Sequence, residues 1–308
     1  MNGDRQDGGA DDTDEFEEST FSRYLLPIGL FCLTIFTTLW AGAYQDHPNR
    51  FHPFRGAWEL LTERPGELIN GIPFAGTLLL ILVTHELAHY VYSKRHGVPA
   101  SLPLFIPGLP LLVGTFGAII RVRGQILERK ALFDIGISGP LAGFAVALVA
   151  LVIGLHWSQI EMGISSASPF YVGRSVLIDW CVSLVLGEMP RGTSVNLHPV
   201  AEAAWFGLFV TCLNLIPIGQ LDGGHVAYAL WGRRQRTIAL WVIPVLLVLG
   251  YFGWQGWWLW VILSTLLGVG HPPIPDPTSP LGSTRIWLGR ATVLLFILIF
   301  TPFPIVTR

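Results

Sequence analysis

Two histidines and a glutamate stand close together in an apolar stretch of the chain, the segment His85-Glu86-Leu87-Ala88-His89. If this stretch is helical, His85 and His89 are four residues apart on one face, where two imidazoles can hold one Zn²⁺ ion. Glu86 then lies about a hundred degrees around the helix, close enough to act as general base for an attacking water. The pattern predicts a hydrolytic metal site.

The same three residues allow other interpretations. A polar helix face could line the water path of a membrane channel or transporter, or the two histidines could bind a haem. Two histidines and one carboxylate also form the metal site of non-haem iron oxygenases. Ionisable side chains within a membrane are costly and usually mark a functional site. Each of these alternatives accordingly gives His85 and His89 a functional role.

A catalytic zinc usually has three protein ligands and a water, so a third ligand must come from elsewhere in the chain. Asp222 is the best candidate, because it follows an apolar segment and precedes Gly223 and Gly224. Pro217 and Gly219 should unwind the chain just before it. A carboxylate at a break in a membrane helix needs a partner, which a metal would supply. The alternative is an ordinary N-cap aspartate.

The composition places these residues in a membrane. Of 308 residues, 51% are hydrophobic and only 13% are charged, whereas about a quarter are charged in soluble domains. A net charge of -2 gives no indication of nucleic-acid binding. Spanning a bilayer takes about 20 apolar residues. The windows that reach or approach this length predict an α-helical polytopic membrane protein with about six or seven spans, at 25–43, 72–92, 131–156, 199–218, 237–252, 256–269 and 286–300.

Between the second and third predicted spans, residues 101–124 are rich in proline and glycine and end in an alternating pattern at 119–123. This predicts a small re-entrant or strand element rather than a helix. Irregular backbone at membrane depth requires a wet or protein-lined cavity, so we expect one beside His85. The element could pair with an unwound substrate as an added strand.

Charge sets the expected orientation and domain limits. Residues 1–22 are acidic and predict a disordered cytosolic tail, followed by a membrane-embedded domain at 23–308 with its catalytic core at about 72–231. In a seven-span arrangement, thirteen of the nineteen Lys and Arg residues fall on one side, which predicts a cytosolic N-terminus and active site. The first apolar run lacks the flanks of a signal or transit peptide, so a bacterial cytoplasmic membrane is expected.

The segment 85–89, followed by Asn214-x-x-Pro217-x-x-x-Leu221-Asp222-Gly223-Gly224, resembles the site-2 protease family of intramembrane zinc metalloproteases. The resemblance implies that His85, His89 and Asp222 bind one zinc ion and that Glu86 is the catalytic base. It places Asn214 near the substrate backbone, where it could also bind the developing oxyanion. The alternative for Asn214 is a hydrogen bond between helices.

Weaker similarities accompany these motifs. The small-residue run 136–143 is similar to a family segment, and its Gly139 and Gly143 form a face that lets helices approach closely. Segments 114–118 and 270–273 resemble the branch found in bacteria and chloroplasts. No loop has room for the PDZ domain of another branch. The resemblance implies a transmembrane protein substrate in a lipid environment; the sequence leaves the oligomeric state open.

Overall fold

The structure is a computed structural model of the 308-residue chain, and it describes residues 24–45, 52–111, 113–120, 124–162, 170–190 and 192–307. The predicted acidic tail at 1–22 lies outside the described residues, as does the end of the alternating pattern, residues 121–123.

The described residues are mainly helical. The helices are α1 (Leu26–Gln45), α2 (Pro53–Thr62), the 3₁₀ helix η2 (Pro65–Gly71), α3 (Ile72–Arg95), α4 (Arg129–Trp157), α5 (Val176–Leu186), α6 (Pro199–Asn214), α7 (Asp222–Trp231), α8 (Arg234–Phe252), α9 (Gly256–Leu267) and α10 (Ser283–Ile299). The strands are β1 (Leu104–Pro107), β2 (Thr115–Ile119), β3 (Gln159–Met162), β4 (Phe170–Val172), β5 (Thr193–Asn196) and β6 (Ile305–Thr307).

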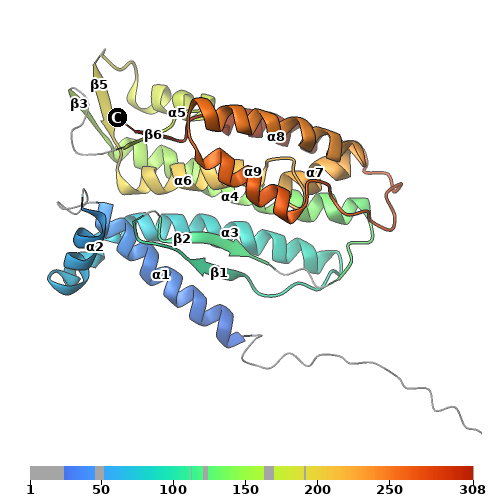
Figure 1. The fold of residues 1–308 in the computed structure, drawn as a ribbon, viewed down its shortest axis with the longest axis horizontal. Coiled ribbons are helices and arrows are strands. Elements are labelled where there is room, and N and C mark those ends of the chain that lie inside the picture. Colours follow the sequence, from blue (N-terminus) through green and yellow to red (C-terminus); the bar gives the residue numbers. More distant parts are fainter. Residues whose placement is uncertain are drawn as a thin grey trace, which may run out of the picture.

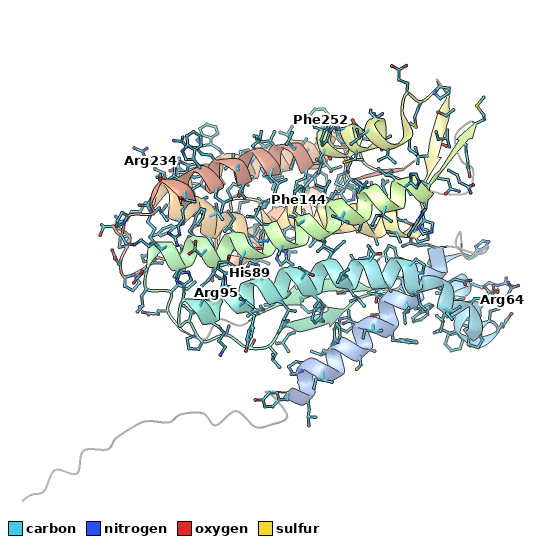
Figure 2. The ribbon with its side chains drawn as sticks, turned by 180° about the vertical axis from the view of Figure 1, so that it is seen from behind. Arg64, His89, Arg95, Phe144, Arg234 and Phe252 are labelled. Atoms are coloured by element: carbon cyan, nitrogen blue, oxygen red, sulfur yellow. The ribbon has the colours of Figure 1, made fainter. Side chains whose placement is uncertain are left out.

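The long helices run lengthwise beside one another (Figure 1). Helix α3 lies between α1 on one side and α4 with α6 on the other, and it contacts all three. Helix α7 packs on α4 and α8. Figure 2 shows Arg95 and Arg234 at one end of this bundle and Arg64 at the other, with His89 nearer the Arg95 end. We call the end with Arg95 and Arg234 the basic end.

Four helical segments of the described chain are long and apolar enough to cross a membrane: Leu26–Gln45, Pro65–Arg95, Arg129–Trp157 and Arg234–Phe252. They correspond to the first, second, third and fifth windows of the sequence. The other three predicted spans are shorter helices, with 16 residues in α6, 12 in α9 and 17 in α10. The helix in the fourth window is shorter than the predicted span at 199–218, because α6 stops at Asn214, ahead of Pro217.

Helix α3 carries the His/Glu cluster and has well-defined ends. Pro73 occupies its first turn, where the missing N–H is no loss. The helix stops after Arg95, because Gly97 adopts a positive φ of 67° and its N–H donates to the Lys94 carbonyl. Since the rise is 1.5 Å per residue, His89 lies about 9 Å along the helix from Arg95.

Between α3 and α4, β1 and β2 form an antiparallel pair with Leu104 opposite Ile119 and Phe105 opposite Ala118. Strand β1 packs on α1, and β2 also contacts α3. Phe116 and Ile119 on β2 are both largely exposed. These strands belong to a two-stranded sheet, so the outer edge of β2 is not paired with another described strand.

At the basic end, a charged cluster ties three helices together. Both guanidinium nitrogens Nε and Nη2 of Arg285 donate to the carboxylate of Asp134, each at 2.8 Å. Nε2 of His96, just beyond α3, lies 2.9 Å from the same carboxylate. This forked Arg–Asp pairing holds the start of α10 against α4.

Candidate metal centre

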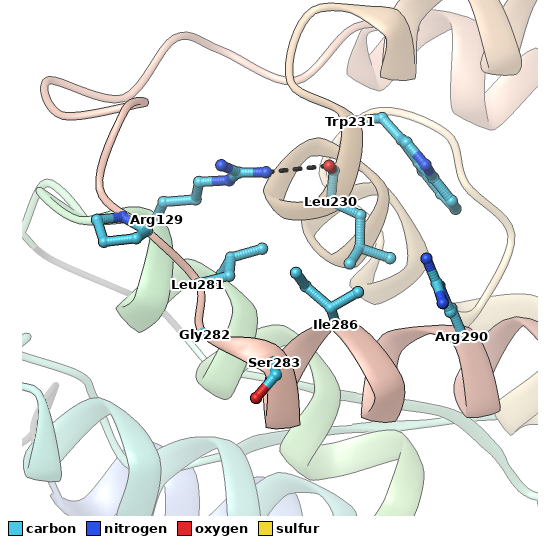
Figure 3. A pocket seen from close by; sticks show the side chains of 9 residues that line it. Arg129, Leu230, Trp231, Leu281, Gly282, Ser283, Ile286 and Arg290 are labelled. Carbon is cyan, nitrogen blue, oxygen red and sulfur yellow. Dashed lines mark hydrogen bonds between the residues drawn. The ribbon is translucent and has the colours of Figure 1, made fainter.

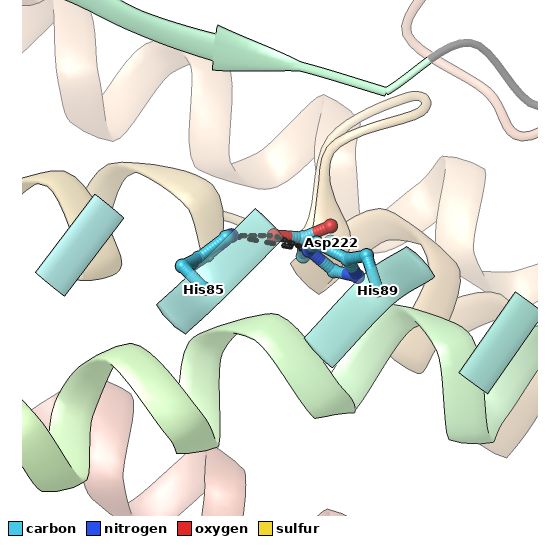
Figure 4. A group of neighbouring side chains, drawn as sticks. All are labelled: His85, His89 and Asp222. Atoms are coloured by element: carbon cyan, nitrogen blue, oxygen red, sulfur yellow. Dashed lines mark hydrogen bonds and ion pairs between the residues drawn. The ribbon is translucent and has the colours of Figure 1, made fainter. Parts of the chain in front are cut away.

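Three side chains from two distant parts of the chain converge beside α4 (Figure 4). Nε2 of His85 and Nε2 of His89 each lie 3.3 Å from Oδ2 of Asp222, and the two nitrogens lie 3.1 Å from each other. All three potential ligand atoms lie within 4.8 Å of one another. His85 is buried and the other two are partly buried. The three residues that were predicted from the sequence as metal ligands are therefore adjacent in space.

The imidazole of His89 is oriented by the backbone of α4. Its Nδ1 lies 2.8 Å from the Ile135 carbonyl oxygen, and because a carbonyl can only accept, Nδ1 carries the proton. In the neutral ring Nε2 then has the lone pair that a metal ion needs, and Nε2 faces Asp222. Metal-binding histidines typically have such a partner on the other ring nitrogen. The sequence motif does not contain this partner, which only the packing of α3 on α4 supplies.

Two glycines of α4 make room for the two rings. A methyl group at Gly139 would overlap Nε2 of His89, and one at Gly143 would lie 3.2 Å from Nδ1 of His85. The predicted close approach of another helix to this Gly-x-x-x-Gly face is present. The side chains that pack against the two glycines are His89 and His85 of α3. Pro140 lies between the two glycines, inside α4. Without an N–H it leaves a gap in the helical hydrogen bonding at this point.

Asp222 is presented by a tight reversal of the chain. Helix α6 ends at Asn214, Gly219 has a positive φ of 54°, and α7 begins at Asp222 with Leu221 as its N-cap. Asp222 is thus the first residue of α7 and not its N-cap, which the alternative interpretation had predicted. A side chain at Gly223 would collide with the Leu215 carbonyl, which explains the small residue directly after the aspartate.

A buried glutamine, Gln235 of α8, holds this reversal in place. Its Nε2 donates to the carbonyl oxygens of Pro217 and Val269, at 3.1 and 3.3 Å, and its Oε1 accepts from the backbone N–H of His271 at 2.9 Å. The Gly219 N–H also donates to the Val269 carbonyl. No sequence pattern predicts this role, because Gln235 stands in the basic run Arg233-Arg234-Gln235-Arg236.

Glu86 and Asn214 flank the cluster. Glu86 is 7% exposed on α3, and its carboxylate interacts electrostatically with His89 and Asp222. Nδ2 of Asn214 lies 3.4 Å from Nε2 of His85. Asn214 thus contacts the cluster directly, and Glu86 lies within electrostatic range of it.

Two further histidines lie behind Asp222. Nδ1 of His225 is 2.8 Å from Nε2 of His271, and the Tyr228 ring stacks on His271 with centroids 4.5 Å apart. Nδ1 of His271 faces the Pro272 carbonyl at 2.6 Å, so it holds a proton and Nε2 accepts from His225. The loop that carries His271 thus packs on α7. Burial lowers the pKa of His271 and favours this neutral form.

The arrangement suits a tetrahedral metal ion. Two imidazole nitrogens and one carboxylate oxygen are the ligand types that Zn²⁺ takes in hydrolytic sites, with one position left for water. The orienting bond from His89 to Ile135 fits the same role. The helical membrane fold and these residues define a polytopic membrane protein with a candidate metal centre between α3 and α7.

The comparison with protein families gives this class a name. Residues 73–251, more than half of the chain, match the model of peptidase family M50. The chain therefore belongs to peptidase family M50, the site-2 protease family that its two motifs indicated.

Several plant proteins are similar to the chain. It is 32% identical to "Probable zinc metalloprotease EGY2, chloroplastic" of Arabidopsis thaliana, over 77% of this chain and 43% of that protein. It is 29% identical to "Probable zinc metalloprotease EGY1, chloroplastic" of Oryza sativa subsp. japonica, over 92% of this chain and 51% of that protein. The chain thus spans about half the length of the curated relatives it matches.

Proposed function

We propose that this chain is an intramembrane zinc metalloprotease that hydrolyses a peptide bond within or near a transmembrane helix of another membrane protein. The observation that carries the proposal is the convergence of His85, His89 and Asp222 beside Glu86. Membership of peptidase family M50 and the names of the plant relatives support a zinc-dependent protease over a channel, a transporter or an iron oxygenase.

In this proposal the two histidines and Asp222 hold the zinc ion, which when bound supplies Lewis acidity toward the scissile carbonyl and the attacking water. Glu86 takes a proton from that water and delivers it to the leaving nitrogen. The bond from His89 to Ile135 keeps Nε2 of the ring directed at the centre. Asn214, beside His85, donates from its amide to the substrate backbone or to the developing oxyanion.

A substrate helix must unwind before its backbone can be attacked, because its amides are otherwise hydrogen-bonded. We propose that the unwound segment adds to the outer edge of β2, which is not paired with another described strand and exposes Phe116 and Ile119. A proline at Ile119 or Ile120 should then reduce cleavage while metal content stays unchanged. Full cleavage by both variants would refute this part of the proposal.

We also propose the finer placement in the membrane. Helices α6, α9 and α10 complete about six or seven spans together with the four long segments. The β1–β2 pair is a re-entrant element, and the domain runs over 23–308 with its core at 72–231. The positive-inside rule places the N-terminus and the basic end in the cytosol, and a bacterial cytoplasmic membrane fits that orientation. Reporter fusions in the loops at each end of the bundle test the orientation, and fractionation tests the membrane.

One variant separates the protease from its alternatives. Glu86→Gln should keep one zinc per chain and lower cleavage of a transmembrane substrate by about 10²–10⁴-fold, the usual contribution of a general base. Glu188→Gln, at an exposed site, is the matched control. Unchanged function without stoichiometric metal would indicate a channel or transporter. Stoichiometric iron, with function that does not need Glu86, would indicate an oxygenase.

A further inference from the structure

Two cavities lie one after the other along α10. The first, of about 540 Å³, is at the basic end and is lined by Arg129, Arg290, Ser283 and Trp231 among others. The second, of about 290 Å³, is lined almost wholly by apolar side chains, including Val226, Val293 and Ile297. Trp231 lines both cavities. None of the residues lining either cavity is His85, Glu86, His89 or Asp222.

We propose that these two cavities form one binding site for an anionic phospholipid, with the phosphate in the first cavity and an acyl chain in the second. We call them the headgroup cavity and the acyl cavity. The proposal concerns lipid binding and does not depend on the proposed peptidase activity.

The headgroup cavity has the chemistry of a phosphate site (Figure 3). Two arginines line it, and none of its lining residues is acidic. Arg129 donates to the carbonyl oxygens of Ala229 and Leu230, which fixes its guanidinium at the cavity wall. The guanidinium of Arg290 lies 4.8 Å from the Trp287 ring centroid, and it extends toward Trp231 in Figure 3.

The start of α10 adds backbone donors to the same cavity. Gly282 is the N-cap of this 17-residue helix, and no side chain caps the helix there. The first N–H groups of a helix have no partner within it and attract anions. Both Gly282 and Ser283 line the headgroup cavity. Backbone and guanidinium donors thus meet at one place, which a phosphate group can occupy.

The acyl cavity continues the site toward the membrane interior. On α10 the lining positions 283, 286, 290, 293 and 297 follow one helix face, at intervals of three and four residues. From Ser283 to Ile297 this face is about 21 Å long, close to half the thickness of a bilayer with its headgroups. One phospholipid in one leaflet has about this length. Its charged headgroup and apolar acyl chain match the charged lining of the first cavity and the apolar lining of the second.

The acyl cavity also reaches the segment that carries the candidate metal ligand. Leu215, Pro217 and Gly223 form part of its wall. Asn214 and Asp222 are the direct chain neighbours of Leu215 and Gly223. A bound acyl chain would therefore pack against the reversal from which Asp222 projects.

The test titrates the purified full chain in detergent with phosphatidylglycerol or phosphatidylcholine of identical acyl chains, and counts bound lipids by native mass spectrometry. The wild-type chain should bind one phosphatidylglycerol more tightly than phosphatidylcholine. Arg290→Gln should weaken phosphatidylglycerol binding about fivefold, the effect of one arginine at a membrane surface, while Arg290→Lys keeps most of it. Val293→Trp should weaken both lipids by filling the acyl cavity.

Matched controls are Arg234→Gln at the basic end and Val245→Trp on α8, neither of which lines either cavity. Both should bind lipid as the wild type does. Melting in lipid-free detergent shows whether each variant is folded. If Arg290→Gln and Val293→Trp are folded and bind phosphatidylglycerol normally, the proposal is wrong.

Two other ligands give different results. If glycerol phosphate binds as tightly as phosphatidylglycerol and Val293→Trp leaves that binding unchanged, the site takes a soluble phosphate and the lipid proposal fails. If both cavity variants keep lipid binding but lose crosslinking to a transmembrane peptide, the two cavities bind a peptide and the lipid proposal is wrong.

Discussion

Gly139 of α4 lies so close to His89 of α3 that a methyl group at Gly139 would overlap the ring nitrogen Nε2. The same imidazole is held from its other side by the Ile135 carbonyl, four residues earlier on α4. Helix α4 thus both orients His89 and limits the space in which its ring can lie. Substitutions in α4 should therefore affect the candidate metal centre, as should substitutions of the three converging residues.

Substituting Gly139 should disturb metal binding without removing a ligand. Gly139→Ala must displace the His89 ring, and overpacking of this kind costs about 1–3 kcal/mol. We expect zinc affinity to fall about tenfold or more, measured by competition with a chelator. Gly143→Ala should have a smaller effect, because its methyl would lie 3.2 Å from His85. Gly76→Ala, with open space around the new methyl group, is the control. Equal zinc affinity in all three variants would contradict this account.

Loss of either kind of ligand should have the same consequence. His89→Ala and Asp222→Ala each remove one of the three converging donors, so both should reduce bound zinc to well below one per chain, measured by elemental analysis. His156→Ala, exposed at the other end of α4, should keep its zinc. A full complement of zinc in Asp222→Ala would remove Asp222 from the ligand set.

Gln235 should be needed for stability although it is not near the metal ligands in sequence. Gln235→Leu leaves the Pro217 and Val269 carbonyls and the His271 N–H without this partner. Unsatisfied buried groups cost about 1–3 kcal/mol each, so the melting temperature in detergent should drop clearly. Gln255→Leu, at an exposed position before α9, serves as the comparison and should melt like the wild type. An unchanged melting temperature for Gln235→Leu would show that the hydrogen bonds of Gln235 do not stabilise the chain.

His271 should make the chain less stable in acid. Burial lowers the pKa of His271 below its ordinary value of about 6.5. The unfolded chain therefore binds this proton at a higher pH than the folded chain. The contribution of His271 is complete above about pH 6.5 and is lost as the pH falls toward the folded pKa. His225 and Tyr228 are the titratable groups that face it.

The measurement is the melting temperature in detergent between about pH 5 and 8, where an unperturbed histidine titrates. His271→Gln should flatten the decline on the acid side. His156→Gln should leave the decline as it is in the wild-type chain. A decline of equal slope in His271→Gln would assign the acid sensitivity to other groups.

Much of the fold follows from local pattern. Long apolar runs predicted α1, α3, α4 and α8 to within a few residues, because a membrane helix satisfies its own backbone and needs only length and hydropathy. The shorter runs were harder to interpret. The window at 199–218 reads as one apolar segment, yet α6 ends at Asn214. Length and hydropathy alone do not locate such a break, whereas Pro217 and Gly219 do.

The sequence by itself predicted the candidate donors of the site, because the i, i+4 spacing of His85 and His89 and the Asp-Gly-Gly segment at Asp222 are local chemical patterns. Only the tertiary structure decided that these patterns meet, and which groups hold them together. The Ile135 carbonyl is a backbone atom with no signature in the sequence. The buried Gln235 stands in a run of arginines, and His271 stands 46 residues after the histidine that it contacts. Such contacts arise when helices far apart in the chain pack together, so no local spacing encodes them.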